Sequence, residues 1–206
     1  MNYKIEQAAS EDIRWIAKFE AEMYSAEDAV PEDILRDWYS QNPTGFSTIK
    51  YKGKMIGHVD LLPLRSSVLG RFMDGDITER EIRGSDLFSA GEPELIRTIY
   101  VESVALAASN GLTRALAVKH VLLNWMDMIS RVGDPRRIEN IFAVAATSSG
   151  KRFLKALGFS IVSQAQDRKD QHDLYVTRLA RLEDEMSQRF AGARIRHDSV
   201  PALAEI

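Results

Sequence analysis

The sequence contains no cysteine among its 206 residues. This absence excludes disulfides, thiolate metal ligands and a cysteine nucleophile. A long apolar run is also missing. The opening stretch, MNYKIEQAASEDIRWIAKF, has acidic side chains and no apolar core of signal-peptide length. We therefore expect a cytoplasmic protein with no membrane segment.

Neither sign of charge dominates the chain, whose formal net charge is −3. This balance provides no general attraction to nucleic acid or to an anionic membrane, and we expect neither as a partner. An apolar fraction of 45% and a charged fraction of 28% are ordinary for a globular protein. The length fits one domain with a short appendage.

Histidine is sparse, and the four that occur, His58, His120, His172 and His197, show no metal-ligand spacing. We therefore predict no metal site. The segment DRKDQHD, residues 167–173, has no serine or glycine and is interpreted as a solvated, charged loop.

Hydrophobic periodicity indicates alternating strands and helices. In the first part, Ser10 is the expected N-cap of a helix, and Lys52–Gly53–Lys54 has the composition of a hairpin turn. The predicted elements there are a strand near 3–9, helices at 11–24 and 30–43, and a hairpin at 45–64. Those that follow are strands at 95–106, 137–147 and 173–179 and helices at 112–130 and 148–159.

This order predicts an α/β (α+β) fold in which helices flank a mixed, mostly antiparallel sheet. A charged stretch at 65–94 separates the third and fourth strands and is either a substrate loop or a plain solvated insertion. The main domain is expected at 1–179. Residues 180–206 are a charged C-terminal helix and tail, either solvated or in contact with a partner, so a homodimer is possible.

Two joints between a strand and a helix have the composition of an anion site. In ESVALAASNGLTRALAVKH, residues 102–120, Ser109 and Asn110 suit a helix N-cap, and Gly111 permits close approach of a phosphate to the backbone. An ordinary capped helix explains the same residues. The second joint, VAATSSGKRFLKALGF, is not a P-loop, because Ala145 replaces its first glycine and Arg152 follows the lysine.

The order of elements, together with GKMIGHVDLLPL, IYVESVAL and the LGF ending, resembles the GNAT superfamily of acyl-CoA-dependent N-acyltransferases over about residues 3–179. The resemblance implies transfer of an acetyl or short acyl group from acetyl-CoA, or another acyl-CoA, to a primary amine. It also implies that a backbone N–H near Val104 to Leu106 binds the thioester oxygen. The implied cofactor-binding residues are Val104, Leu106, Ser109, Asn110, Gly111, Leu112, Thr113, Arg114, Thr147 and Phe153.

The sequence departs from the family pattern in two places. Ala108 and Thr113 replace the usual Arg or Gln and the final Gly or Ala of the pyrophosphate loop. Leu154 stands where many members have a tyrosine that protonates the CoA thiolate, with Tyr100 and Tyr175 as possible substitutes. These departures support an alternative, a catalytically inactive GNAT-fold module that binds CoA or a protein partner.

Glu102 is the predicted catalytic residue, because a carboxylate on the central strand can accept the proton of the amine. Strand alternation predicts that it shares a face with Val104 and Leu106. The alternative is a structural glutamate. In that case solvent or a residue of the insertion, such as Glu79 or Glu81, takes the proton.

Overall fold

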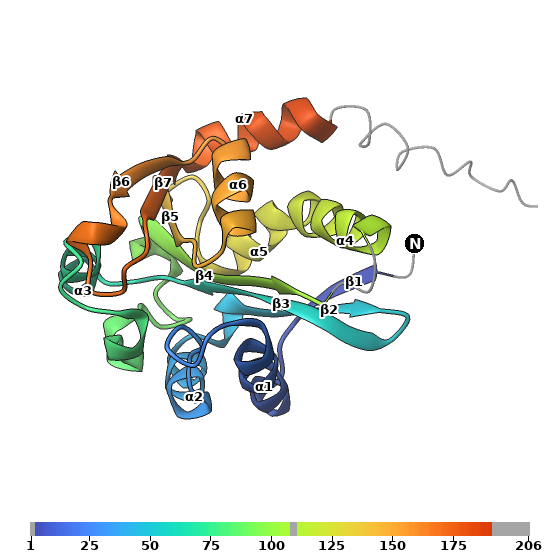
Figure 1. Ribbon diagram of the computed structural model, residues 1–206, viewed down its shortest axis with the longest axis horizontal. Helices are drawn as coiled ribbons and strands as arrows, with labels where there is room; N and C mark the ends of the chain where they lie inside the picture. Colours follow the sequence, from blue (N-terminus) through green and yellow to red (C-terminus); the bar gives the residue numbers. More distant parts are fainter. Residues whose placement is uncertain (1–2, 108–110, 191–206) are drawn as a thin grey trace, which may run out of the picture.

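The computed structural model describes residues 3–107 and 111–190, with the backbone alone for 111–113 and 190. One open seven-stranded sheet has the order β1-β2-β3-β4-β5-β7-β6 (Figure 1). Its strands are β1 (Tyr3–Gln7), β2 (Phe46–Tyr51), β3 (Lys54–Leu62), β4 (Thr98–Leu106), β5 (Asn140–Val144), β6 (Ser160–Ser163) and β7 (Leu174–Arg178). The β4–β5 pair is parallel, and the other neighbours are antiparallel. The predicted fold class is therefore confirmed.

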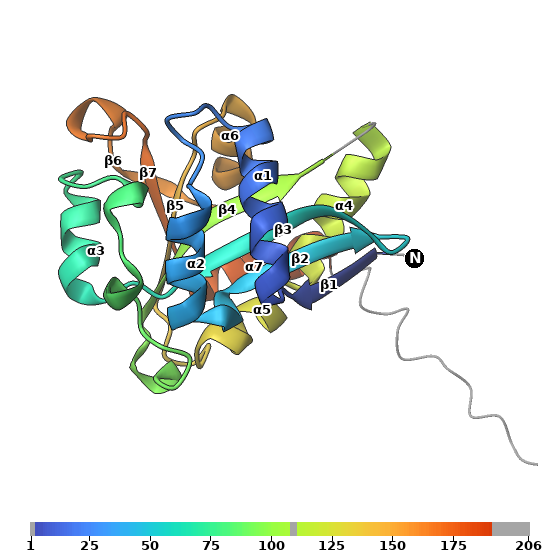
Figure 2. The ribbon, with the colours of Figure 1, turned by 90° about the horizontal axis from the view of Figure 1, so that it is seen from below.

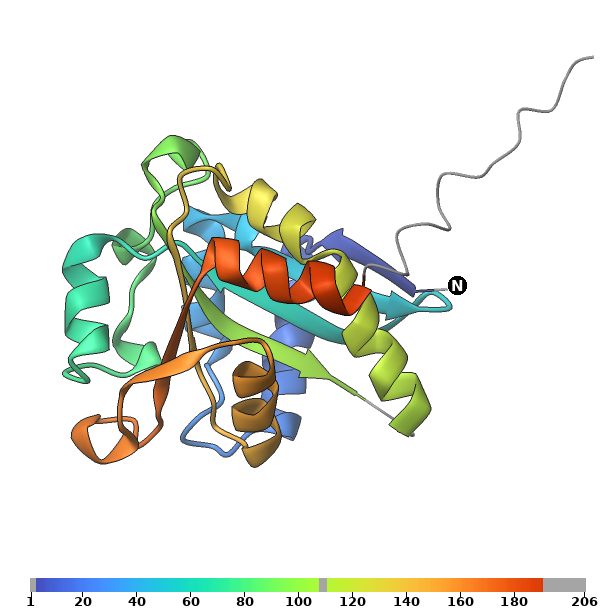
Figure 3. The same cartoon turned by 90° about the horizontal axis from the view of Figure 1, so that it is seen from above.

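Helices cover both faces of the sheet. One face carries α1 (Ile13–Met23), α2 (Glu32–Gln41) and α3 (Ser66–Met73), whose apolar side chains share a core (Figure 2). The other carries α4 (Gly111–Leu123), α5 (Trp125–Val132), α6 (Ser148–Ala156) and α7 (Leu179–Phe190) around a second core (Figure 3). Among the described residues, no helix has the length and apolar character needed to cross a membrane.

Two local predictions about the helices are wrong. The expected helix at 112–130 is two helices, because the chain leaves helical geometry at Asn124, whose side-chain amide donates to the carbonyl of His120. Ser10 is not the N-cap of α1. It begins the 3₁₀ turn η1 (Ser10–Asp12), where the Asp12 carboxylate accepts the N–H of Ala9 at 2.9 Å.

Segment 65–94 is packed, so the solvated-insertion alternative is wrong. It contains α3 and the 3₁₀ turns η3 (Glu79–Glu81), η4 (Gly84–Asp86) and η5 (Pro93–Leu95). Its buried apolar residues, Val68, Phe72, Ile77, Ile82 and Leu87, join the core beneath α1 and α2. Most of them are five residues apart, which fits neither the helix nor the strand period, and the periodicity test therefore misses them.

The loop at 167–173 is exposed at Asp167, Lys169 and Gln171, as expected, but it buries one charged side chain. Arg168 is 2% exposed, and its guanidinium lies 4.8 Å from the ring of Phe72 and donates to the carbonyl of that residue at 2.7 Å. Asp170 completes the charge pair with Arg168. The buried cation is therefore compensated, as burial requires.

The C-terminal helix α7 belongs to the main core. Leu179, Leu182 and Met186 are buried together with side chains of α4 and α5. The expected boundary after residue 179 therefore falls within the first turn of this helix. The tail at 191–206 lies outside the described residues. Dimerisation stays a prediction.

Gly45 provides a stability test, because the 3₁₀ turn η2 (Pro43–Gly45) packs its backbone against β3. A methyl group there would lie inside van der Waals contact with the Leu61 carbonyl oxygen. We expect Gly45→Ala to lower the free energy of unfolding by about 1–3 kcal/mol. Gly70→Ala is the control, because its added Cβ meets no atom within 4 Å and should stabilise α3 by about 0.5–1 kcal/mol. Urea denaturation of both variants measures the difference, and equal midpoints would contradict the packing at Gly45.

Candidate active site

Strand β4 separates from β5 halfway along its length. The two strands pair from Thr98↔Asn140 to Val101↔Ala143, whereas β4 continues to Leu106. A cavity of about 730 Å³ opens beside the unpaired half of β4. It is lined by both strands and by the beginnings of α4 and α6.

The α6 side of the cavity is suited to an anion. Thr147 caps the helix, and its hydroxyl accepts the N–H of Gly150 at 3.0 Å. Thr147 and Gly150 both line the cavity, as does Arg114 in the first turn of α4. Helix starts present free N–H groups and a partial positive charge, so phosphate groups are favoured there.

Glu102 lies at a bulge in β4. On β3, Asp60 pairs with Ser103 and the next residue, Leu61, pairs with Val101, so Glu102 is the extra residue between them. The bulge interrupts strand alternation. Val101 now packs toward the α4–α7 core together with Val104 and Leu106.

The predicted alternation is therefore wrong at Val101, which shares its face with Val104 and Leu106. The neighbouring Ser103 faces the opposite helix layer, where its hydroxyl lies 3.3 Å from that of Tyr24, just after α1. The charge of Glu20, which belongs to α1, raises the pKa of the Glu102 carboxyl.

The carboxyl of Glu102 is poised to be neutral. Burial raises its pKa well above the usual value, and the charges of Glu20, Glu79 and Asp60 raise it further. Its Oε2 is shielded from solvent and has no hydrogen-bond partner among the described residues. Once ionised, such a group is a strong proton acceptor.

Three further titratable groups in the cavity lining are Glu79, Tyr24 and His172. Burial raises the pKa of Glu79 to about 7, although this carboxylate accepts a hydrogen bond from Tyr100. Burial also raises the pKa of Tyr24, so its hydroxyl keeps its proton. His172 lines the cavity as well and bonds Asp28 at 2.9 Å.

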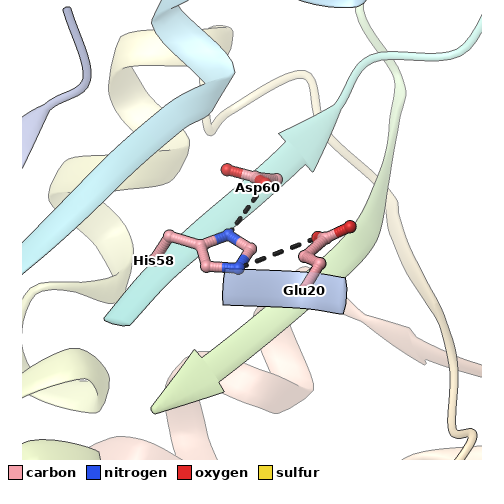
Figure 4. A group of neighbouring side chains, drawn as sticks. All are labelled: Glu20, His58 and Asp60. Atoms are coloured by element: carbon pink, nitrogen blue, oxygen red, sulfur yellow. Dashed lines mark hydrogen bonds and ion pairs between the residues drawn. The ribbon is translucent and has the colours of Figure 1, made fainter. Parts of the chain in front are cut away.

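A buried cluster of Glu20, His58 and Asp60, drawn in Figure 4, lies outside the cavity lining. Nδ1 of His58 is 2.9 Å from Asp60, and its Nε2 is 3.7 Å from Glu20. One carboxylate oxygen each of Glu20 and Asp60 and one ring nitrogen of His58 lie within 4.8 Å of one another. Sequence spacing does not reveal this grouping, because Glu20 comes from α1. Burial lowers the pKa of His58, but the two carboxylates outweigh it and raise the pKa overall.

The structure brings together most of the described site residues. The cavity lining includes Glu102, Val104, Leu106, Arg114, Thr147 and Phe153. Gly111, Leu112 and Thr113 form the first turn of α4, where only the backbone is described, and Ser109 and Asn110 lie outside the described residues.

The suggested tyrosines lie away from the cavity lining. Tyr100 is fully buried and donates to Glu79. Tyr175 is 1% exposed, and its hydroxyl has no partner in the part of the chain that the structure describes. Leu154 contributes an apolar side chain to the cavity wall and cannot donate a proton.

Sequence analysis missed Tyr24, Trp125 and His172 as cavity residues. Tyr24 follows an amphipathic helix without any motif, and Trp125 follows the unexpected break at Asn124. Only His172 carried a signal, since a histidine between acidic residues at 170 and 173 is unusual for a plain loop.

No protein-family model matches the chain, and no curated protein matches it significantly. Solved structures do match. The loading GNATL domain of CurA from Lyngbya majuscula superposes with a TM-score of 0.61 at 16% identity, covering 86% of this chain and 98% of that domain. The GphF GNAT-like decarboxylase, in complex with isobutyryl-CoA, has a TM-score of 0.57 at 14% identity, covering 85% and 99%.

A Salmonella typhimurium protein solved with its cofactor acetyl-CoA has a TM-score of 0.54 at 16% identity. The match covers 87% of this chain and 95% of that one. At these identities the likeness concerns the fold. The chain therefore has a divergent form of the GNAT superfamily fold, as its sequence resemblance implies.

Proposed function

We propose that this protein is an acyl-CoA-dependent N-acyltransferase that moves an acetyl or short acyl group to a primary amine. The observation that carries the proposal is the parting of β4 from β5, which opens a cavity with anion-binding helix starts along one side and a buried carboxyl at a strand bulge. One side suits a phosphate-bearing cofactor, and the other suits a reacting amine.

In this proposal the CoA pyrophosphate lies at the first turn of α4, and Thr147 and Gly150 of α6 border the cofactor farther along. The two structural neighbours with bound CoA derivatives support acyl-CoA as the co-substrate. Phe153 and Leu154 supply an apolar wall for the rest of the cofactor. Binding of the pyrophosphate depends on backbone N–H groups in this proposal, so it does not require the arginine or glutamine that the loop lacks.

The thioester carbonyl lies against the half of β4 that β5 leaves unpaired. A backbone N–H near Val104 to Leu106 donates to its oxygen and stabilises the negative charge that forms during attack. Glu102 takes the proton of the amine, whose nitrogen then forms the C–N bond as the C–S bond breaks. CoA leaves as a thiolate, which is tolerable because a thiol has a pKa of about 8.5.

Tyr24 replaces the missing tyrosine of the family pattern as a hydrogen-bond donor. Its hydroxyl lies at the cavity beside Ser103, and because burial raises its pKa it stabilises the departing thiolate by donating a hydrogen bond, while the thiolate takes its proton from solvent. Leu154 leaves no donor at the usual position, and Tyr24 supplies one from the opposite helix layer.

The acidic end of the cavity favours an amine over a carboxylate. One structural neighbour is a decarboxylase, so loss of CO₂ from a carboxyacyl-CoA is a reaction to test. Glu79 and Glu102 both line the cavity. Whenever either carboxyl is ionised, it repels a substrate carboxylate and attracts an ammonium group.

The second candidate is a module that binds CoA without turnover. The sequence departures at Ala108, Thr113 and Leu154 favour it. Calorimetric titration with acetyl-CoA, followed by thiol-release assays on a panel of amines and by CO₂ release from malonyl-CoA, distinguishes the candidates. Binding with amine-dependent thiol release supports the transferase, whereas binding without any release supports the module.

Gly111→Glu tests the position of the pyrophosphate. The change adds bulk and negative charge at the first turn of α4, so we expect affinity for CoA to fall at least about tenfold, or about 1.4 kcal/mol. Gly70→Glu, the same change in α3 away from the cavity lining, should leave affinity unchanged. Calorimetry on both folded variants decides the point, and parent-like binding by Gly111→Glu would place the pyrophosphate elsewhere.

Glu102→Gln tests the proton acceptor. Gln keeps the size of the side chain but cannot accept the proton, so kcat should fall by about 10²–10⁴-fold while CoA binding persists. In the parent, kcat/KM should rise with pH through an apparent pKa above that of an ordinary glutamate, because the raised pKa of Glu102 leaves it ionised only at higher pH. Equal rates and equal pH profiles for the two proteins would show that Glu102 is structural.

A further inference from the structure

The cluster of Glu20, His58 and Asp60 has one cation between two carboxylates. His58 and Asp60 are 0% exposed and Glu20 is 1% exposed. Asp60 contacts one ring nitrogen and Glu20 lies opposite the other, so the arrangement matches a doubly protonated imidazole (Figure 4). Phe19 closes one side with its ring centroid 5.9 Å from that of His58.

This arrangement suits an ion pair better than a metal. A metal ion binds along the lone pair of one ring nitrogen, and its other ligands must gather around that same point. Asp60 and Glu20 lie at different nitrogens of the ring. A single ion bound to either nitrogen is therefore poorly placed to reach both carboxylates.

The cluster adjoins Glu102 through two elements. Asp60 pairs with Ser103, the residue next to Glu102, across the β3–β4 ladder. Glu20 lies one helical turn before Tyr24, whose hydroxyl reaches the same Ser103. The bulge therefore lies beside both carboxylates of the cluster.

Glu20 is held in a fixed position. Its Oε2 accepts the N–H of Val30 at 3.2 Å, while its Oε1 is directed to His58 and has no hydrogen-bond partner among the described residues. The cation of His58 favours the charged form of Glu20, whereas burial, the largest effect, raises its pKa to about 7. Glu20 therefore carries its negative charge above about neutral pH, where the imidazole of His58 and the N–H of Val30 hold it in place.

We propose that Glu20, fixed by His58 and Asp60, is a positioning residue whose charge holds the Glu102 carboxyl in its protonated form while the cavity is empty. No bond forms or breaks in Glu20 itself. A bound ammonium group offsets the repulsion, so Glu102 can then release its proton to solvent water in the cavity and afterwards accept the proton of the amine. The inference thus adds a preference for a cationic acceptor to the proposed transferase, and rests on that function.

Several other groups act on the same carboxyl and must be separated from Glu20. They are Glu79 of η3, Asp60 of β3, Tyr100 of β4 and Tyr24 after α1. Glu79 comes from the insertion and bonds Tyr100, but its charge also acts on Glu20. Glu79→Gln therefore measures the contribution of the insertion, both direct and through Glu20.

Carbon-13 NMR of protein labelled at the glutamate carboxyl carbons tests the proposal without any turnover. The Glu102 signal is the one lost in Glu102→Gln, and its midpoint in the parent should lie well above the ordinary value of about 4.3. Glu20→Gln removes the neighbouring charge and should lower that midpoint by about one pH unit or more, a tenfold change in the ionisation constant. Glu22→Gln, an exposed change in the same helix, should leave it unaltered.

Each result has one meaning. An unchanged titration midpoint of Glu102 in folded Glu20→Gln overturns the proposal. A Glu102 midpoint near the ordinary value in the parent protein also overturns it, and that measurement requires no variant of Glu20. Stoichiometric binding of Zn²⁺ that is lost in His58→Gln also overturns it, by making the cluster a metal site. A shifted midpoint in a protein that shows no acyl transfer supports the coupling while removing the transferase.

Discussion

The site depends on the loss of pairing between two parallel strands. Strand β4 is nine residues long but pairs with β5 through Val101, and beyond that point its backbone groups face the cavity. Buried backbone groups need partners, and a strand edge that faces a cavity is ready to bind an extended ligand. The catalytic proposal, the cofactor position and the acceptor end all follow from this one separation.

The bulge at Glu102 adds a second constraint. Without the extra residue, strand alternation would place Glu102 with Val104 and Leu106 on the side of the α4–α7 core. With it, the carboxyl lies near the charges of Glu20 and Asp60 in a setting of low polarity. The bulge directly follows the last pair between β4 and β5, so the side chain beside the open strand edge lies near charges that raise its pKa.

Sequence patterns predict the strands and helices of this protein better than the part of the cavity wall that is proposed to bind the amine. The strand order and the helix starts at Gly111 and Thr147 follow from alternation, turn residues and capping preferences. The bulge does not, because it depends on register with β3, and no local pattern marks it. The proximity of Glu20 to His58 is equally hidden, since it joins a helix to a strand 38 residues away in the sequence.

A buried charge beside the cavity wall also affects how the sequence of the proposed amine-acceptor site can change. Two distant segments build one side of the cavity, with Glu79 and Arg80 from the insertion and Lys169 to His172 from the loop before β7. Arg168 joins them through Phe72, and the N–H of Lys169 donates to the Gly75 carbonyl at 3.0 Å. Replacing only one of these segments with that of a relative would leave the guanidinium of Arg168 without its hydrogen-bond acceptor. New acceptor specificities should therefore arise when both segments are replaced together.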